Sequence, residues 1–240
     1  MIQAFLSACT TSAETPEEIR HALRLEPTGI PVAFDGSVFS SFDDYIKDRQ
    51  SHLAEYKVFQ NPSNREEELK IAAPFRIDPF AESASGQCKK QTGATRGIVL
   101  IHGLSDMPAA MKDLAHAFAV RCFVTYSVLL PGHGARASEM LEVSRHDWIA
   151  AVQFAVDAMG LEVDEVYVGG FSLGGLLAVQ TAINNADVAG VFGFSPALSL
   201  HRSFFLNQTV WIRLFKDWLD TDPPDDPWRF ESIPLSLIHI

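Results

Sequence analysis

Ser172 is the residue whose neighbours most clearly predict chemistry. The segment from Val166 to Gly175 reads as a strand that ends at this serine and turns at once into a helix. Gly170 and Gly174 complete the pattern G-x-S-x-G, in which glycines are used because a side chain would crowd a strained turn. The following helix would direct its free N–H groups and its dipole toward the serine oxygen, where negative charge develops. The pattern therefore predicts a nucleophilic serine.

The same three residues also occur in ordinary strand-to-helix turns, so the flanking sequence has to decide. Residues 165–169 form a short run rich in β-branched side chains, and residues 176–183 continue as an apolar helix. A strand before the serine and a helix after it are the context that a nucleophile requires. We therefore interpret Ser172 as the candidate catalytic residue.

Charge and composition limit the partners that the chain can have. Its 240 residues suffice for one sizeable α/β domain. The net charge of −11, from 19 basic and 30 acidic residues, argues against a nucleic-acid backbone or an anionic membrane surface as the main partner. No apolar run is long enough to span a bilayer, and the three cysteines lack metal-site spacing. We expect no nucleic-acid partner, no metal and no cofactor.

The N-terminal stretch places Cys9 after small residues and resembles the lipobox of bacterial lipoproteins. We interpret residues 1–15 as a truncated lipoprotein signal and tether, with a lipid anchor at Cys9 and the protein in the periplasm or at a membrane. The alternative is the frayed terminus of a cytoplasmic protein, because only eight residues precede Cys9 and none is basic. In an oxidising periplasm Cys88 and Cys122 could form a disulfide, and two unpaired thiols are the alternative.

Residues 16–96 form an N-terminal extension without recognisable chemistry. Apolar residues at helical spacing predict an amphipathic surface helix over 41–56. Residues 69–77 alternate weakly and predict an edge strand, and the polar stretch 83–96 predicts a linker or exposed loop. We expect the extension either to pack on the core or to position the domain relative to a membrane or partner.

Residues 97–200 alternate between buried strands and helices. Continuous apolar runs predict strands at 97–104, 122–130, 163–169 and 188–195. Helices are predicted between them, over 106–121, after the cap Ser144, and after Ser172. This alternation implies right-handed crossovers, and hence an α/β fold with a parallel-sheet core flanked by helices.

Three motifs in this core carry a family resemblance. They are His102-Gly103, Pro131-Gly132-His133-Gly134 and Gly170-Phe171-Ser172-Leu173-Gly174, each at the end of a predicted strand. In this order and spacing the chain resembles the α/β-hydrolase family, specifically its serine aminopeptidase-like, monoacylglycerol-lipase-like and carboxylesterase-like branch. The resemblance covers residues 97–200 and implies an α/β-hydrolase fold that is incomplete at the C-terminus.

The resemblance also implies roles for individual residues. Ser172 would attack an acyl carbon, and the backbone N–H groups of Leu104 and Leu173 would form the oxyanion hole, each worth about 3 kcal/mol in the transition state. His102 would hold the oxyanion loop and His133 would shape a turn, so neither would move protons. The serine also needs a histidine oriented by a carboxylate, and in this fold both follow it in the chain.

The C-terminal part of the chain does not supply these two partners. Residues 201–234 are rich in aromatic side chains and resemble the start of the family's helical cap, which would line an apolar pocket; the alternative is that they pack on the sheet. Residues 235–240 resemble the translation of a transposon end found in sequencing libraries, and a natural short tail is the alternative. We therefore expect the acid and the histidine in a longer parent protein, and little or no turnover from these 240 residues.

The predicted function is that of a serine hydrolase that cleaves carboxylic or lipid esters through an acyl-enzyme. Its partner would be a small-molecule ester or acyl substrate. Two alternatives stay open: a serine aminopeptidase that acts on short peptides, and a non-catalytic binding protein with an α/β-hydrolase fold. A series of acyl lengths, compared with amide substrates, separates the esterase from the peptidase. A histidine and an acid further along the intact gene would separate the enzyme from the binding protein.

Overall fold

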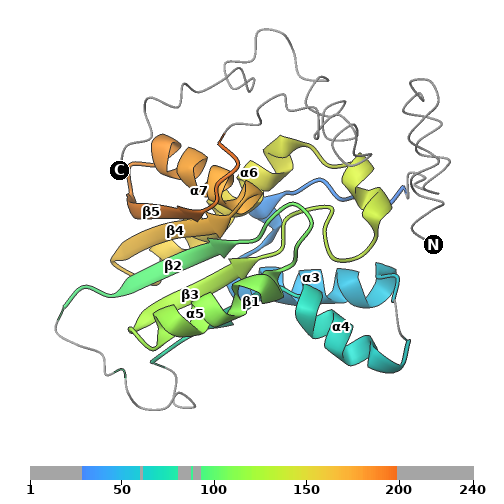
Figure 1. The fold of residues 1–240 in the computed structure, drawn as a ribbon, viewed down its shortest axis with the longest axis horizontal. Coiled ribbons are helices and arrows are strands. Elements are labelled where there is room, and N and C mark those ends of the chain that lie inside the picture. The colour runs from blue at the N-terminus through green and yellow to red at the C-terminus, as the bar shows by residue number, and fades with distance from the viewer. Residues whose placement is uncertain (1–28, 60–61, 81–87, 89–92, 199–240) are drawn as a thin grey trace, which may run out of the picture. The chain divides into compact units, whose positions relative to one another are not determined.

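A five-stranded sheet in the order β1-β3-β2-β4-β5 forms the centre of the computed structural model, which describes residues 29–59, 62–80, 88 and 93–198 (Figure 1). The four strands β2 to β5 are parallel, and β1 runs antiparallel to β3 at one edge. The α/β class and the parallel core predicted from the sequence are therefore confirmed, with one antiparallel strand added. The strands are β1 Phe75–Ile77, β2 Arg96–Ile101, β3 Phe123–Val128, β4 Glu165–Phe171 and β5 Val188–Phe194.

The register of the central strands determines which loops lie together. Arg96 of β2 pairs with Phe123 of β3 and with Glu165 of β4, so these strands begin along one line. Likewise Ile101 pairs with Gly170, so β2 and β4 end side by side. We call the end where β2 to β5 begin the amino end of the sheet, and the end where they finish the carboxyl end.

Helices cover both faces of this sheet. Ile98 and Leu100 pack with Met111 and Ala115, so the first helix of the core lies on their face. Gly97 points to the other face, where a Cβ would lie 2.2 Å from the sulfur of Met159. The helices are η3 Pro108–Met111, α5 Lys112–Ala119, η4 Ala137–Leu141, α6 Arg145–Gly160 and α7 Leu173–Asn184.

The ends of the core helices follow local signals. The prediction that Ser144 caps a helix is confirmed, because Ser144 and Asp147 form a reciprocal capping box at the start of α6. The helix predicted over 106–121 is shorter: a 3-10 turn begins at Pro108 and α5 ends at Ala119. Pro108 favours the first turn, and Cys122, with φ of 64°, takes the chain out of the helical region.

The N-terminal extension contains the predicted surface helix and one element that the sequence reading got wrong. Helix α3 spans Phe42–Tyr56 and is capped by Ser41, as expected. The edge strand predicted over 69–77 is confirmed only at its end, as the short edge strand β1, and its first residues instead belong to helix α4, Arg65–Ala72. Three glutamates in the first turn of α4 favour a helix by interacting with its dipole, and this outweighs the weak alternation.

The extension packs into the same compact unit as the core, which runs from Pro27 to Ala197. Phe42 of α3 stacks on Tyr126 of β3 with ring centroids 3.9 Å apart. Tyr45 contacts Phe42 and joins this pair to a cluster of rings in mutual contact, which also contains Phe34, Phe39 and Phe154. Residues 29–80 therefore supply part of the hydrophobic core. Of the two roles expected for the extension, the structure shows that it packs on the core.

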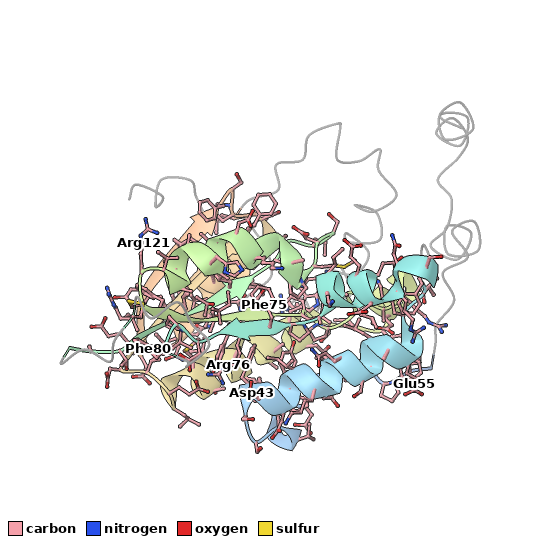
Figure 2. The ribbon with its side chains drawn as sticks, turned by 90° about the horizontal axis from the view of Figure 1, so that it is seen from below. Asp43, Glu55, Phe75, Arg76, Phe80 and Arg121 are labelled. Atoms are coloured by element: carbon pink, nitrogen blue, oxygen red, sulfur yellow. A yellow bond between two sulfur atoms is a disulfide. The ribbon has the colours of Figure 1, made fainter. Side chains whose placement is uncertain are left out.

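An ion-pair network on the underside of the sheet links the extension to the core. Figure 2 shows Asp43 of α3 beside Arg76 of β1, and their side chains are 3.1 Å apart. Arg76 also binds Glu162 at 2.7 Å, and Glu162 accepts a hydrogen bond of 2.5 Å from the hydroxyl of Tyr126. Burial raises the pKa of Tyr126 above its ordinary value, so it remains a phenol. One guanidinium thus connects α3, β1 and the loop after α6.

Cys88 and Cys122 form a disulfide, with Cα atoms 5.5 Å apart. Of the two alternatives left open by the sequence, the structure contains the bridge. It joins the segment before β2 to the residue before β3, at the amino end of the sheet. The crosslink therefore lies at the opposite end of the strands from Ser172.

Several sequence-based expectations fall outside the described residues. These are the lipid anchor at Cys9 with residues 1–15, the cap over 201–234 and the tail over 235–240. In the part of the chain that the structure describes, no helix is both long and apolar enough to cross a bilayer.

Candidate active site

Ser172 occupies the sharp turn between β4 and α7 in a backbone conformation that side chains rarely adopt. Its φ of 52° and ψ of −113° lie outside the regions that non-glycine residues favour, and such strain costs about 1–3 kcal/mol. Three hydrogen bonds hold the turn: Ser172 N–H donates to Phe194 O at 3.0 Å, and Ser172 O accepts from Leu176 N–H at 3.1 Å and from Ala197 N–H at 3.0 Å. The strain persists because β5 and α7 both fix the same residue.

The two motif glycines are required by backbone atoms that cannot move aside. A Cβ on Gly174 would lie 2.1 Å from the carbonyl oxygen of Ile101 and 2.6 Å from that of His102. A Cβ on Gly170 would lie 2.4 Å from the carbonyl carbon of Gly174. The glycines therefore permit α7 to begin directly against the end of β2, which brings the serine next to the loop that follows β2.

The side chain of Ser172 is partly exposed, and it makes no capping hydrogen bond to α7. The next residue, Leu173, is the first of α7 and is 6% exposed. Because the N–H groups of a first helical turn lack partners within the helix, the Leu173 N–H is available to an anion at this position. The local geometry agrees with what a nucleophile at a helix N-terminus requires.

The loop after β2 lies against the same turn. A Cβ on Gly103 would be 3.2 Å from the ring of Phe171, the residue before the serine. Leu104, the residue proposed from the resemblance as the second oxyanion donor, follows directly and is partly buried. The structure thus brings together the segments of Leu104, Leu173 and Ser172, while the chemical roles assigned to them stay predictions.

His102 is fully buried and engaged through both ring nitrogens. Its Nδ1 lies 2.8 Å from Gly103 O, and its Nε2 accepts a hydrogen bond of 3.1 Å from Leu130 N–H. Since Nε2 accepts, the proton must be on Nδ1, which donates to Gly103 O. Burial, aided by the nearby His133, lowers the pKa of His102 to about 3, so the ring is neutral at pH 7. These contacts agree with the structural role expected for it.

His133 makes a contact that the sequence did not predict. Its Nε2 lies 2.6 Å from Leu104 O, and its Nδ1 lies 3.1 Å from Pro131 O. Burial is the main cause that lowers the pKa of His133 below its ordinary value. The turn of Pro131 is held in addition by Trp148, whose Nε1–H donates to Pro131 O at 3.0 Å. The motif Pro131-Gly132-His133-Gly134 was the available signal, but a partner 29 positions away cannot be read from it.

No general base for Ser172 is apparent in the described ranges. The hydrogen bonds found there connect no histidine to the serine, and both ring nitrogens of His102 and of His133 face backbone groups. The same ranges contain no cluster of three or more residues that could hold a metal ion.

A mainly parallel sheet with a strained serine at the carboxyl end of a central strand defines an α/β protein of the hydrolase type. The profile of the Alpha/beta hydrolase family matches residues 98–237, which is more than half of the chain. The chain therefore belongs to the alpha/beta hydrolase family, which confirms the resemblance drawn from its three motifs.

The proteins that the chain resembles include lipases and esterases. The thermostable monoacylglycerol lipase of Bacillus sp. (strain H-257) is 29% identical over 104 residues, which are 43% of this chain and 42% of that lipase. This chain thus matches under half the length of that curated relative. A structure of the metagenome-derived lipolytic enzymes LipS and LipT is 29% identical, with coverage of 48% and 47% and a TM-score of 0.45. The monoacylglycerol lipase of Paleococcus ferrophilus is 24% identical, with coverage of 46% and 44% and a TM-score of 0.40.

Proposed function

We propose that the protein is a serine-dependent hydrolase that cleaves carboxylic or lipid esters through an acyl-enzyme. The observation that carries this proposal is the strained backbone of Ser172, held between β4, β5 and α7 with the loop of Leu104 beside it. Strain of this kind persists only where the surrounding structure enforces it, and it is typical of functional sites.

The reaction would proceed in two steps, acylation of the serine and hydrolysis of the acyl-enzyme. The Oγ of Ser172 attacks the acyl carbon and loses its proton to a general base, and the alcohol leaves with a proton to form the acyl-enzyme. Water then attacks the acyl-enzyme, releases the carboxylic acid and restores the serine. In both steps the N–H groups of Leu104 and Leu173 stabilise the oxyanion by about 3 kcal/mol each. The general base and its carboxylate stay unassigned among the described residues.

An apolar surface beside the serine supports an acyl or lipid ester as substrate. Phe171 and Phe194, which end β4 and β5 next to Ser172, expose 43% and 50% of their surface. Large aromatic side chains at such a position suit an acyl chain. The lipases and esterases among its relatives support the same class of substrate.

The proposal is tested by covalent labelling of the 240-residue chain with a fluorophosphonate, a reagent electrophilic enough to react, at a reduced rate, with a serine in an oxyanion hole that lacks its base. We expect one adduct, located at Ser172 by peptide mass spectrometry and absent in Ser172→Ala. Turnover is measured with p-nitrophenyl esters from acetate to palmitate and with aminoacyl p-nitroanilides. We expect slow ester hydrolysis and no anilide hydrolysis, because no base for the serine has been located. A chain that forms no adduct, or a Ser172→Ala variant that still reacts, would contradict the proposal.

We also propose that the protein works in an oxidising compartment. The Cys88–Cys122 bridge supports this, because disulfides persist outside the reducing cytosol. Thiol blocking in intact cells before lysis is the test: both cysteines should stay unlabelled until a reductant is added. A lipid anchor at Cys9 belongs to the same proposal and is measured by incorporation of labelled palmitate, with Cys9→Ser as the control. Free thiols at Cys88 and Cys122 in freshly lysed cells would contradict it.

A further inference from the structure

The two peptide groups on either side of Leu104 are each bonded to a buried histidine. The carbonyl of Gly103, in the peptide before Leu104, is bonded to His102 Nδ1 at 2.8 Å and to Asp106 N–H at 3.2 Å. The carbonyl of Leu104, in the peptide after it, is bonded to His133 Nε2 at 2.6 Å. The rings of His102 and His133 contact each other with centroids 4.9 Å apart. The loop is therefore held by side chains on consecutive carbonyls.

The first of these bonds sets the direction of the Leu104 N–H. In a trans peptide the N–H points opposite to the C=O of the same plane. Fixing Gly103 O toward His102 and Asp106 therefore turns the Leu104 N–H away from them. That plane keeps its orientation only while the chain on its far side stays in place. Holding the carbonyl of Leu104 fixes that side of the loop, so the plane that carries the Leu104 N–H cannot swing about the backbone bonds of Gly103.

The short distance identifies which nitrogen of His133 carries the proton. The proton is assigned to Nε2, because two facing lone pairs repel more strongly at the 2.6 Å between Nε2 and Leu104 O than at the 3.1 Å and 3.2 Å between Nδ1 and the carbonyl oxygens of Pro131 and Leu130. The carbonyls that face Nδ1 have other donors, because Pro131 O accepts from Trp148 and Leu130 O accepts from His133 N–H at 3.1 Å. Neutral His133 with its proton on Nε2 therefore leaves no carbonyl of this group without a donor.

We propose that His133 is a positioning residue, which holds the Leu104 carbonyl so that the Leu104 N–H stays aimed at the oxyanion formed on Ser172. This assignment rests on the proposed function, because it presumes that the Leu104 N–H stabilises that charge. It differs from the role expected from the sequence, in which His133 only shaped its own turn. The ring acts on the reaction through the Leu104 peptide and does not touch the substrate.

The turn that carries His133 is anchored by the N-terminal extension. Lys57 Nζ donates to Gly134 O at 2.8 Å, and Val58 N–H donates to Ala135 O at 3.1 Å. On the other side of the turn, the hydroxyl of Tyr45 donates to Leu129 O at 2.7 Å and accepts from Leu129 N–H at 3.0 Å. The imidazole is thus carried by a segment whose backbone is fixed both before and after it, as a positioning residue requires.

The test compares His133→Ala, which removes the donor, with His133→Gln, whose side-chain amide retains one. The rate constant for fluorophosphonate addition to Ser172 should fall by about tenfold or more in His133→Ala and recover to within about threefold of wild type in His133→Gln. The concentration of reagent that gives half the maximal rate should change little, because a positioning residue affects the chemical step. The matched control is His116→Ala on the exposed face of α5, which should react at the wild-type rate.

Two measurements that do not need a reactive serine separate this inference from the proposed function. Nitrogen NMR of the wild-type imidazole should show the proton of His133 on Nε2. Hydrogen exchange at the Leu104 amide should accelerate about tenfold in His133→Ala while the amides of β4 stay protected. If the wild type forms no adduct but both NMR results hold, the proposed function fails and His133 still positions Leu104. A proton on Nδ1, or unchanged Leu104 exchange in His133→Ala, overturns the inference even if Ser172 reacts.

Discussion

The two ends of the sheet are held in different ways. At the carboxyl end, backbone strain at Ser172 is maintained by close glycine contacts and by buried imidazoles, which are fixed in place by Tyr45 and Trp148. At the amino end the disulfide Cys88–Cys122 and the surface pair of Thr95 with Asp164 connect the segments that begin the strands. The imidazoles of the first set are buried, whereas the second set is partly or fully exposed. Changes at the carboxyl end should therefore alter reactivity, whereas changes at the amino end should alter stability alone.

The largest expected effect is that of Gly174→Ala at the carboxyl end. The new Cβ would lie 2.1 Å from a backbone oxygen of β2, so the strand or the helix must shift. We expect the free energy of unfolding in urea to fall by about 4 kcal/mol or more, and labelling of Ser172 to be lost.

The control for this variant is Gly160→Ala at the end of α6, where a Cβ meets nothing nearer than 3.9 Å. It should change stability by less than about 1 kcal/mol. A folded Gly174→Ala protein whose Ser172 is labelled at the wild-type rate would show that close contacts at this glycine do not maintain the site.

The next effect is at the amino end, where Cys88→Ser combined with Cys122→Ser removes a crosslink between residues 34 positions apart. Loop-closure entropy predicts a loss of about 3–4 kcal/mol in the free energy of unfolding. The rate of Ser172 labelling below the unfolding transition should stay at the wild-type value. Cys9→Ser serves as the control for removing a thiol, and a labelling rate that falls with the bridge would contradict the separation of the two ends.

A third prediction concerns acid, because the pKa values of His102 and His133 are lowered by burial. Below the ordinary histidine pKa the unfolded chain takes up protons that the folded chain does not, so stability falls as pH falls. The fall continues down to the folded pKa, about 3 for His102. His102 contributes a slope of about 1.4 kcal/mol per pH unit between roughly pH 6 and pH 4, and His133 adds to this slope just below the ordinary histidine pKa.

Urea unfolding at several pH values in this range measures that slope. His133→Gln removes one of the two titrations, so the slope should decrease by the share of one histidine. His116→Gln, at an exposed position, provides the comparison and should keep the wild-type slope. An unchanged slope in His133→Gln would mean that this ring takes up protons in the folded state as readily as in the unfolded one.

The smallest effect distinguishes a tyrosine hydroxyl in a buried hydrogen bond from one in a half-buried hydrogen bond. Tyr45→Phe leaves both backbone groups of the buried Leu129 without their partner and should cost about 1–3 kcal/mol. Tyr167→Phe loses only a contact of 3.2 Å with Glu165 and should cost about 0.5 kcal/mol or less. Both losses in the free energy of unfolding are measured in urea. Equal losses in Tyr45→Phe and Tyr167→Phe would show that the two ends of the sheet do not differ in the burial of their hydrogen bonds.

Local patterns explain what the sequence predicted correctly. The strands of the core were found because apolar runs of this length suit a sheet covered on both faces, and Ser144 was recognised as a cap from its own residue type. Ser172 was found because steric crowding at the turn imposes glycines at fixed spacing. In each case the cause lies within a few residues of its effect.

Contacts between distant segments explain what the sequence did not predict. His133 contacts Leu104 across 29 positions of the sequence, and Tyr45 contacts Leu129 across 84. Neither contact can be predicted from the spacing of apolar and polar residues. Helix α4 was mistaken for a strand because Leu69 and Ile71 alternate with polar residues, although Lys70 pairs with Glu66 one helical turn away at 2.7 Å. The choice between a disulfide and two thiols also depends on where the fold brings Cys88.

The hydroxyl of Tyr45 has one more effect, on how the outer strand of the sheet terminates. In the register of β1 with β3, Phe75 lies opposite Ser127, so Ala73 would lie opposite Leu129. Pro74 interrupts the strand before that position, and the phenol supplies both the donor and the acceptor that a further peptide would have offered. An aromatic side chain thereby substitutes for one rung of the ladder, and it leaves Leu129 with no open pair of backbone groups to which another polypeptide could attach.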